Sequence, residues 1–331
     1  MVLPFTEYSK LFHSYIRNKK VGRPSVGPLK LNDGTVVDSN IEMAELFAES
    51  FASVYRSEDL RDQAPHQTFD GSLTDIEFSR EETQKLLEKL DVSSSVGPDL
   101  IHPRLLKSCA QILSYPLYLI FMASFYTSLI PREWTTSRII PIFKKGSRSD
   151  PLNYRPISLT SVCCKTMERI VADRLVGYLE ENGILSREQF GFRKGMSVED
   201  QLLLTYNDIS KWVDQGFVVD LVFFDFSKAF DVVNHAIMLI KLKSLGVSDY
   251  FLDWINAFLT DRTMGVAVGG EESGSRPVGS GVPQGSVLGP ILFLIYVNFI
   301  ASGITCSFKI FADDLKLYLF VRHSSFARHS Y

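Results

Sequence analysis

The sequence contains only four cysteines, and their positions favour neither a disulfide framework nor a zinc site. Cys163 and Cys164 are adjacent, whereas Cys109 and Cys306 are isolated, so no pair has the spacing of zinc ligands. The N-terminus MVLPFTEYSK also lacks the charged segment and apolar run of a secretory signal. We therefore expect an intracellular protein of a reducing compartment, the nucleus or cytoplasm, and not a secreted one.

The chain has no strong excess of charge of either sign. Its formal net charge of -3 argues against general binding to polyanions. The charges are unevenly spread, because residues 1–30 carry six Lys or Arg against one Glu, and residues 132–155 carry six against two acids. Residues 38–100 are strongly acidic. Local basic patches are therefore candidates for contacts with nucleic acid on a mildly acidic chain.

Long uncharged apolar runs are scarce as well. The longest candidate, residues 113–130, contains Pro116 and several hydroxyl side chains, which favours a buried helix over a membrane span. With 331 residues and 45% hydrophobic content the chain can bury a sizeable core. Residues 57–72 form a polar connector and the best candidate for a domain boundary. The periodicity predicts helices over 1–20, 41–55, 81–91, 104–130, 165–183 and 200–216, and β-structure over 137–146 and 217–230. Thr74 or Asp75 is the expected N-cap of the helix at 81–91.

Two adjacent aspartates interrupt an apolar stretch near the C-terminus. In FKIFADDLKLYL, residues 308–319, apolar side chains alternate on both sides of Asp313 and Asp314. This pattern predicts a strand, a tight connection and a second strand. Carboxylates at such a tip stay ionised at low cost only beside a positive charge. A divalent cation is one candidate, and a solvated turn is the ordinary alternative.

A third aspartate lies in a similar context. Asp225 interrupts FVVDLVFFDFSKAF, which is β-prone and predicted to be buried, and Asp220 and Asp231 are alternatives to it. Carboxylates at the ends of two strands far apart in sequence are a common way to build a two-metal site. Oxygen ligands suit Mg²⁺, and two such ions about 3.5–4 Å apart clamp the attacking and leaving oxygens of a phosphoryl displacement.

Two loops complete the set of candidate segments. GSGVPQGSVLGPILFLIYVN, residues 279–298, holds Gln284 between a proline and Gly285 on a loop that backbone groups can approach closely. FKKGSRSDPLNYRPISLT, residues 143–160, offers cations to a triphosphate or a nucleic-acid backbone, namely Lys144, Lys145, Arg148 and Arg155. The alternatives are an ordinary strand-to-helix turn and a solvated basic loop.

Together these segments resemble the reverse transcriptases of non-LTR retrotransposons, of the LINE type and close to the jockey-like elements. The segments that carry the resemblance are IPIFKKG with NYRPISL, DFSKAFD, GVPQGSVLGPILF and FADD, with SSSVGPDLIHPRLLK and GFRKGMSVEDQL beside them. Their order and spacing agree over roughly residues 90–318. The resemblance implies an α+β right-hand polymerase with fingers and an antiparallel palm sheet. It divides the chain into an N-terminal region over 1–90, a fingers and palm domain over 91–320, and a divergent tail over 321–331.

The resemblance also implies the roles of single residues. Asp225, Asp313 and Asp314 match the metal-binding aspartates, for two Mg²⁺ ions with Mn²⁺ as an alternative. Phe230 matches the aromatic residue that excludes a 2′-hydroxyl, and Gln284, with Gly285 beside it, matches the glutamine that touches the incoming nucleotide or template. Lys144 or Lys145, together with Arg155, match the triphosphate-binding residues of the fingers. The implied partners are an RNA template, a DNA primer and deoxynucleoside triphosphates (dNTPs), with no membrane.

Only 17 residues follow Asp314. We therefore expect the thumb to be missing and the chain to be a truncated element. The competing hypothesis is a catalytically inactive remnant that at most binds nucleic acid. Phe230 and the FADD segment argue against an RNA-dependent RNA polymerase.

Overall fold

The computed structural model describes residues 26–31, 33–55, 69 and 71–322, which fall into two compact units. The first unit contains residues up to Phe51, Ile139–Ile157 and Gly265–Ser275. The second contains Ala52–Arg138, Ser158–Met264 and Arg276 onward. The helix predicted over 1–20, most of the connector 57–72 and most of the tail 321–331 lie outside the described residues.

Short strands and one helix make up the start of the described chain. The strands β1 (Leu29–Lys30) and β2 (Val36–Val37) pair antiparallel, and helix α2 (Asn40–Ala52) follows. This helix confirms the one predicted over 41–55, and its apolar side chains at helical spacing are buried. Within the first unit the ring of Phe47 packs edge-on against Tyr154, at 4.8 Å between centroids.

Five strands form a sheet in the order β4-β3-β6-β7, with β8 paired to β6. Their bounds are β3 (Thr136–Phe143), β4 (Tyr154–Leu159), β6 (Arg262–Val268), β7 (Glu271–Glu272) and β8 (Arg276–Val278). A 3₁₀ turn, η1 (Pro151–Asn153), precedes β4. The β-rich run predicted over 137–146 is β3, so that prediction is confirmed.

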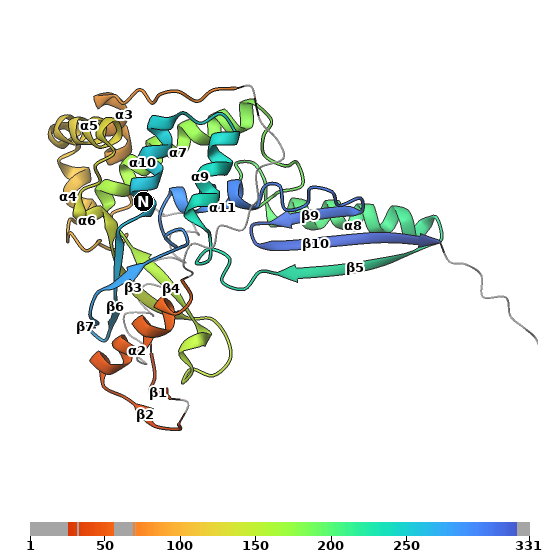
Figure 1. Cartoon of the computed structure of the whole chain (residues 1–331), viewed down its shortest axis with the longest axis horizontal. Coiled ribbons are helices and arrows are strands. Elements are labelled where there is room, and N and C mark those ends of the chain that lie inside the picture. The colour runs from red at the N-terminus through yellow and green to blue at the C-terminus, as the bar shows by residue number, and fades with distance from the viewer. Residues whose placement is uncertain (1–25, 32, 56–68, 70, 323–331) are drawn as a thin grey trace, which may run out of the picture. The chain divides into compact units, whose positions relative to one another are not determined.

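The second unit holds most of the helices (Figure 1). They are α3 (Arg80–Glu88), α4 (Pro103–Ser108), α5 (Ala110–Thr127), α6 (Arg132–Thr135), α7 (Val162–Glu181), α8 (Val198–Asp214), α9 (His235–Ser244), α10 (Asp249–Leu259) and α11 (Leu288–Val297). Their core is rich in aromatic rings, and Phe125 packs edge-on against Phe251 at 5.5 Å between centroids. The predicted helices at 81–91, 104–130, 165–183 and 200–216 are confirmed.

Two details of these helices differ from the prediction. Ser79, not Thr74 or Asp75, caps α3, because its hydroxyl accepts a hydrogen bond from the amide of Glu82 at 3.1 Å. The run 113–130 is only partly buried, since α5 buries Phe121 and Phe125 but leaves Tyr115 53% and Leu119 42% exposed. Among the described residues, no helix combines the length and apolar character that a membrane crossing requires.

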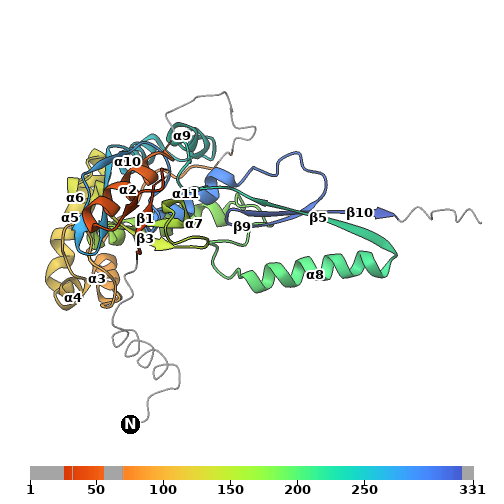
Figure 2. The same cartoon turned by 90° about the horizontal axis from the view of Figure 1, so that it is seen from below.

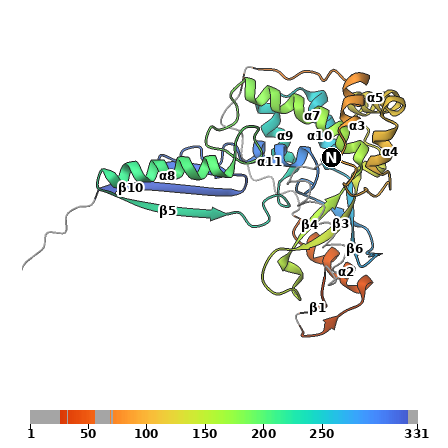
Figure 3. The same cartoon turned by 180° about the vertical axis from the view of Figure 1, so that it is seen from behind.

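A three-stranded antiparallel sheet in the second unit carries the acidic motifs. Its order is β5 (Phe217–Asp225), β10 (Asp314–Arg322), β9 (Ser307–Phe311). The predicted strand–connection–strand over 308–319 is therefore confirmed, and β10 continues to Arg322, beyond the last residue of the alternating pattern. Helix α8 runs alongside β5 and β10 (Figures 2 and 3). Its Asp208 accepts a hydrogen bond from Tyr318 at 2.8 Å, and Trp212 stacks on Phe320 at 4.0 Å between centroids.

The opposite face of this sheet, which also carries Asp220, is largely apolar and partly open. Five of its side chains are between 44% and 53% exposed, namely Val218, Val222, Phe224, Leu319 and Val321. The sequence predicts that β5 is buried, and this prediction is wrong. The physical reason is that β5 is an edge strand of the sheet and α8 packs on one face of it.

Candidate active site

The strand register brings two of the predicted aspartates face to face. Asp225 is the last residue of β5, Asp314 is the first of β10, and the two are direct partners in the antiparallel pair. Side chains of directly opposed residues have Cβ atoms about 4.5–5.5 Å apart, and like charges so placed repel. Both side chains are exposed at the same end of the sheet. The arrangement is therefore a pair of carboxylates that a cation would stabilise.

The same register separates Asp220 from this pair. Asp220 is opposite Leu319, five residues before Asp225 along β5. Because successive strand residues point to opposite faces, Asp220 lies on the other face of the sheet from Asp225. Asp220, one of the two alternatives to Asp225 in the sequence, thus does not share the site.

Asp313 lies in the two-residue connection between β9 and β10. Its neighbour Ala312 has a positive φ of 56° and is 6% exposed, whereas Asp313 is partly exposed. The described residues contain no group of three or more His, Cys, Asp or Glu side chains arranged to hold a metal ion. The pair Asp225–Asp314 nevertheless fits Mg²⁺, which takes one or two carboxylates and completes its shell with waters and substrate phosphates.

Phe230 follows Asp225 in the loop after β5 and is held by two other rings. It stacks on Phe293 of α11 at 4.3 Å between centroids and an interplanar angle of 15°. Phe192 meets it edge-on at 5.9 Å and 82°. Both are favoured geometries for aromatic pairs. Phe230 therefore has a fixed ring plane.

The loop before α11 fixes Gln284. The amide nitrogen of its side chain donates to Asp231 at 2.8 Å, and its backbone oxygen accepts from the amide of Ser158 at 2.8 Å. Gly285 has φ +115°, and a Cβ there would lie 2.6 Å from the Ser158 oxygen. Burial raises the pKa of Asp231, while the hydrogen bond from Gln284 and the charge of Lys228 oppose that rise. Asp231 is thus a support for Gln284.

A residue that the sequence did not single out holds the start of α11. Glu168 on α7 is fully buried and accepts hydrogen bonds from the amides of Val287 and Leu288, at 2.7 and 3.0 Å. A carboxylate at a helix N-terminus satisfies unpaired amides and interacts favourably with the helix dipole. The charge of Glu168 also acts on buried Arg262, where desolvation lowers the pKa and Cys164 and Glu168 raise it.

The predicted fingers cations belong to the first unit. Lys144, Lys145 and Arg155 are exposed, and the amide of Lys144 donates to Asn153 at 2.8 Å across the loop between β3 and β4. Arg148 lies over the ring of Phe143 at 4.3 Å, a cation–π contact. The four cations thus flank one turn, and a shared role with the aspartates of the second unit stays a prediction.

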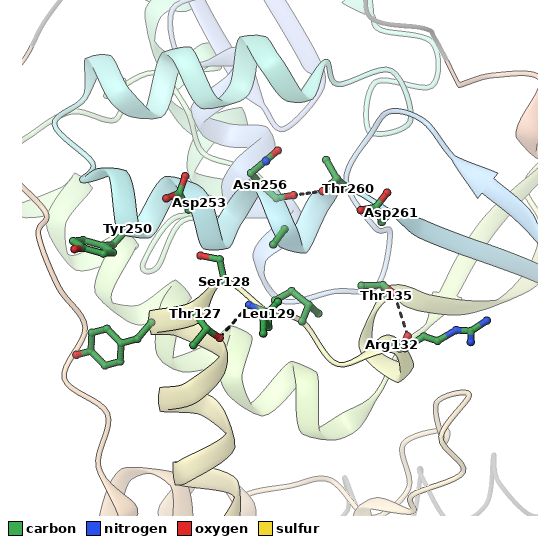
Figure 4. Close-up of a pocket in the computed structure, with 13 residues that line it drawn as sticks. Thr127, Ser128, Leu129, Arg132, Thr135, Tyr250, Asp253, Asn256, Thr260 and Asp261 are labelled. Carbon is green, nitrogen blue, oxygen red and sulfur yellow. Dashed lines mark hydrogen bonds between the residues drawn. The ribbon is translucent and has the colours of Figure 1, made fainter.

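A separate hollow in the second unit contains none of the predicted site residues. It has a volume of about 720 Å³ and lies between the end of α5, α6 and α10. Figure 4 shows Tyr250, Asp253 and Asp261 on one side and Ser128 and Arg132 on the other. Ser128 and Asp261 both have positive φ, near 55° and 51°. The candidate chemistry therefore lies on open strand ends rather than in this hollow.

Comparisons with known proteins agree with these motifs. The family model described as reverse transcriptase (RNA-dependent DNA polymerase) matches residues 142–327. The probable RNA-directed DNA polymerase from transposon BS of Drosophila melanogaster is 31% identical over 81% of this chain and 31% of its own length. The RNA-directed DNA polymerase from mobile element jockey of the same species is 33% identical over 66% of this chain and 24% of its length.

A third relative is the retrovirus-related Pol polyprotein from type-1 retrotransposable element R2 of Popillia japonica, 33% identical over 54% of this chain and 24% of its own length. The chain thus spans about a quarter to a third of the length of these relatives. The family match includes all of β5, α11 and the hairpin of β9 and β10. The chain belongs to the reverse transcriptase family, in the branch of the non-LTR retrotransposons.

Proposed function

We propose that the chain carries out RNA-directed DNA synthesis, the transfer of a deoxynucleotide from a dNTP to a primer 3′-hydroxyl. The observation that supports this most is the direct pairing of Asp225 with Asp314 at adjoining strand ends. Two opposed carboxylates in solvent have no structural benefit of their own, because like charges repel. They are favourable where the ligands are a metal ion and the phosphates of a substrate.

Asp225, Asp313 and Asp314 would hold two divalent ions, Mg²⁺ or Mn²⁺. The chemistry that such ions supply when bound is a lower pKa for the 3′-hydroxyl and neutralisation of charge on the phosphates. The residues themselves orient the reactants. The 3′ oxygen forms a bond to the α-phosphorus while the bond from that phosphorus to the departing pyrophosphate breaks, and the hydroxyl proton passes to solvent.

The remaining predicted residues would select and hold the nucleotide. Phe230, fixed between two rings, would exclude a 2′-hydroxyl by steric clash. Gln284 would contact the nucleotide or template, and Gly285 allows the loop that carries it to pack closely against Ser158. Lys144 or Lys145 with Arg155 would offset the charge of the triphosphate. The partners in this reaction are an RNA template, a DNA primer and dNTPs, and we place it inside the cell, in the nucleus or the cytoplasm.

The test is primer extension on an RNA template with dNTPs and Mg²⁺. Asp225→Asn should lower the rate at least about 100-fold, because it removes one of two opposed ligands of the metal. Asp220→Asn is the matched control, since it makes the same change in the same strand on the other face of the sheet. Equal rates for the wild type and Asp225→Asn would contradict the proposal. A folded wild type that does not extend the primer would favour an inactive remnant.

A further inference from the structure

The turn before the paired aspartates has a backbone conformation that its own residues do not favour. Ala312 is the first of the two residues that connect β9 to β10, and its φ is +56°. Two-residue hairpin loops that need a positive φ at this position strongly prefer glycine, because a side chain there clashes with the backbone. Such a conformation persists where surrounding structure over-determines it. The question is which groups hold Ala312.

One buried side chain forms hydrogen bonds with both backbone groups of Ala312. Gln189 is 3% exposed, and its amide oxygen accepts hydrogen bonds from the backbone nitrogens of Ala312 and Gly191, at 3.0 and 2.8 Å. Its amide nitrogen donates to the backbone oxygen of Ala312 at 3.4 Å. The primary amide therefore pairs with the N–H and the C=O of the residue that directly precedes Asp313.

The backbone around Gln189 fixes it against the same hairpin. The amide of Phe190 donates to the oxygen of Ile310 at 2.9 Å, and the amide of Ile310 donates to the oxygen of Glu188 at 2.8 Å. A Cβ on Gly191 would lie 2.3 Å from the Ala312 nitrogen, so only glycine allows this approach. Residues 188–191 thus pair with β9 and pack against the turn at Ala312.

From these contacts we propose that Gln189 is a positioning residue for the paired aspartates. It keeps Ala312 in its left-handed conformation, which directs the chain so that Asp314 enters β10 opposite Asp225. A glutamine is suited to this because it offers a donor and an acceptor to one peptide, whereas a glutamate offers acceptors alone. The inference rests on the proposed function, since it concerns the geometry of the same metal-binding site.

The test compares three variants of the 331-residue chain. Gln189→Met keeps the length of the side chain and removes all three hydrogen bonds, and Gln189→Glu removes the donated one. Gln201→Met is the matched control, because Gln201 is also a buried glutamine beside β10 but binds Lys316 instead of the turn. Amide hydrogen exchange at residues 308–316 gives a readout that does not depend on activity, and primer extension gives the rate.

For Gln189→Met we expect exchange at Ala312 to accelerate about fivefold, the effect of losing one net hydrogen bond. We also expect kcat to fall on the order of 100-fold, as for a displacement of about 1 Å in a reacting group, and more Mg²⁺ to be needed for half-maximal rate. Gln189→Glu keeps the acceptor for the Ala312 amide and loses only the bond that Gln189 donates, so it should accelerate this exchange less than Gln189→Met does, and it replaces Gln189→Met if that variant does not fold. Gln201→Met should leave the exchange at Ala312 unchanged.

Unchanged exchange at Ala312 in the two Gln189 variants would overturn the proposal, as would faster exchange with an unchanged rate. A folded wild type that does not extend the primer contradicts the proposed function instead. Because exchange is measured without substrate, it then still decides whether Gln189 holds the turn.

Discussion

Replacing Glu168 by alanine tests whether the start of α11 depends on a buried carboxylate from another helix. One oxygen of Glu168 accepts from the amides of Val287 and Leu288, and the other lies 3.5 Å from the sulfur of Cys164. Among the described residues, the N-cap position Val287 contributes no side-chain hydrogen bond of its own. The truncation therefore leaves the buried amide of Leu288 and the partly buried amide of Val287 without their acceptor.

The expected loss of stability follows from these contacts. An unsatisfied buried polar group costs about 1–3 kcal/mol, and two of them cost about 2–6 kcal/mol before relaxation. We therefore expect Glu168→Ala to lower the free energy of unfolding by about 2–4 kcal/mol, in the lower part of that range because Val287 is only partly buried. Glu168→Gln keeps an acceptor for both amides and should cost about half as much.

The assay is urea denaturation followed by tryptophan fluorescence, because Trp134 and Trp254 are buried in the second unit. Glu180→Ala is the matched control. Glu180 is on the same helix but forms a partly exposed ion pair with Arg193, so its loss should cost at most about 1 kcal/mol. Equal midpoints for Glu168→Ala and Glu180→Ala would refute the assignment of Glu168 as the cap of α11.

Three further predictions concern Phe192, Gly285 and Asp231. Phe192→Ala should leave the fold intact, because Phe192 is 51% exposed. The variant should lower the ratio of kcat/KM for dNTPs to kcat/KM for ribonucleotides, because Phe230 loses its edge-on contact with Phe192. Gly285→Ala should lower the melting temperature, since a Cβ lies 2.6 Å from the Ser158 oxygen and the required φ is +115°; an unchanged melting temperature would contradict the loop geometry. Burial raises the pKa of Asp231, so the folded state binds a proton more tightly than the unfolded state does. The free energy of unfolding should therefore fall as pH rises from about the ordinary pKa of 3.8 to the raised value, and this slope should vanish in Asp231→Asn, as measured by denaturation across that pH range.

Apolar periodicity is a local signal, and it predicted the elements that carry the aspartates. The alternation over 308–319 predicted two strands and their connection, because side chains of a strand alternate between faces irrespective of what lies beside it. The position of Asp225 at the end of the apolar strand β5 was predictable for the same reason, because it interrupts the local apolar pattern. The burial of β5 was not predictable in this way, because an edge strand with one covered face has the same apolar pattern as a central strand.

The two buried residues that support the site, Gln189 and Glu168, could not be predicted from the sequence pattern. Gln189 and Ala312 are 123 residues apart, and Glu168 and Val287 are 119 apart. Both supports bind backbone groups, so their partners carry no side chain that a pattern of residue types could reveal. Glu168 also occupies an ordinary polar position in an amphipathic helix, where a charged residue usually faces solvent.

Exposed acids and buried supports therefore have separate roles in this site. Asp225 and Asp314 face solvent, and the register of β5 with β10 sets their spacing. Gln189 and Glu168 are buried, and through backbone hydrogen bonds they hold the turn before Asp313 and the start of α11. Under the proposal, a conservative change in an exposed acid would remove a metal ligand and leave the backbone in place. A change in a buried support would displace the backbone and leave every proposed ligand present. The two kinds of variant should thus differ in amide exchange even where they lose the same activity.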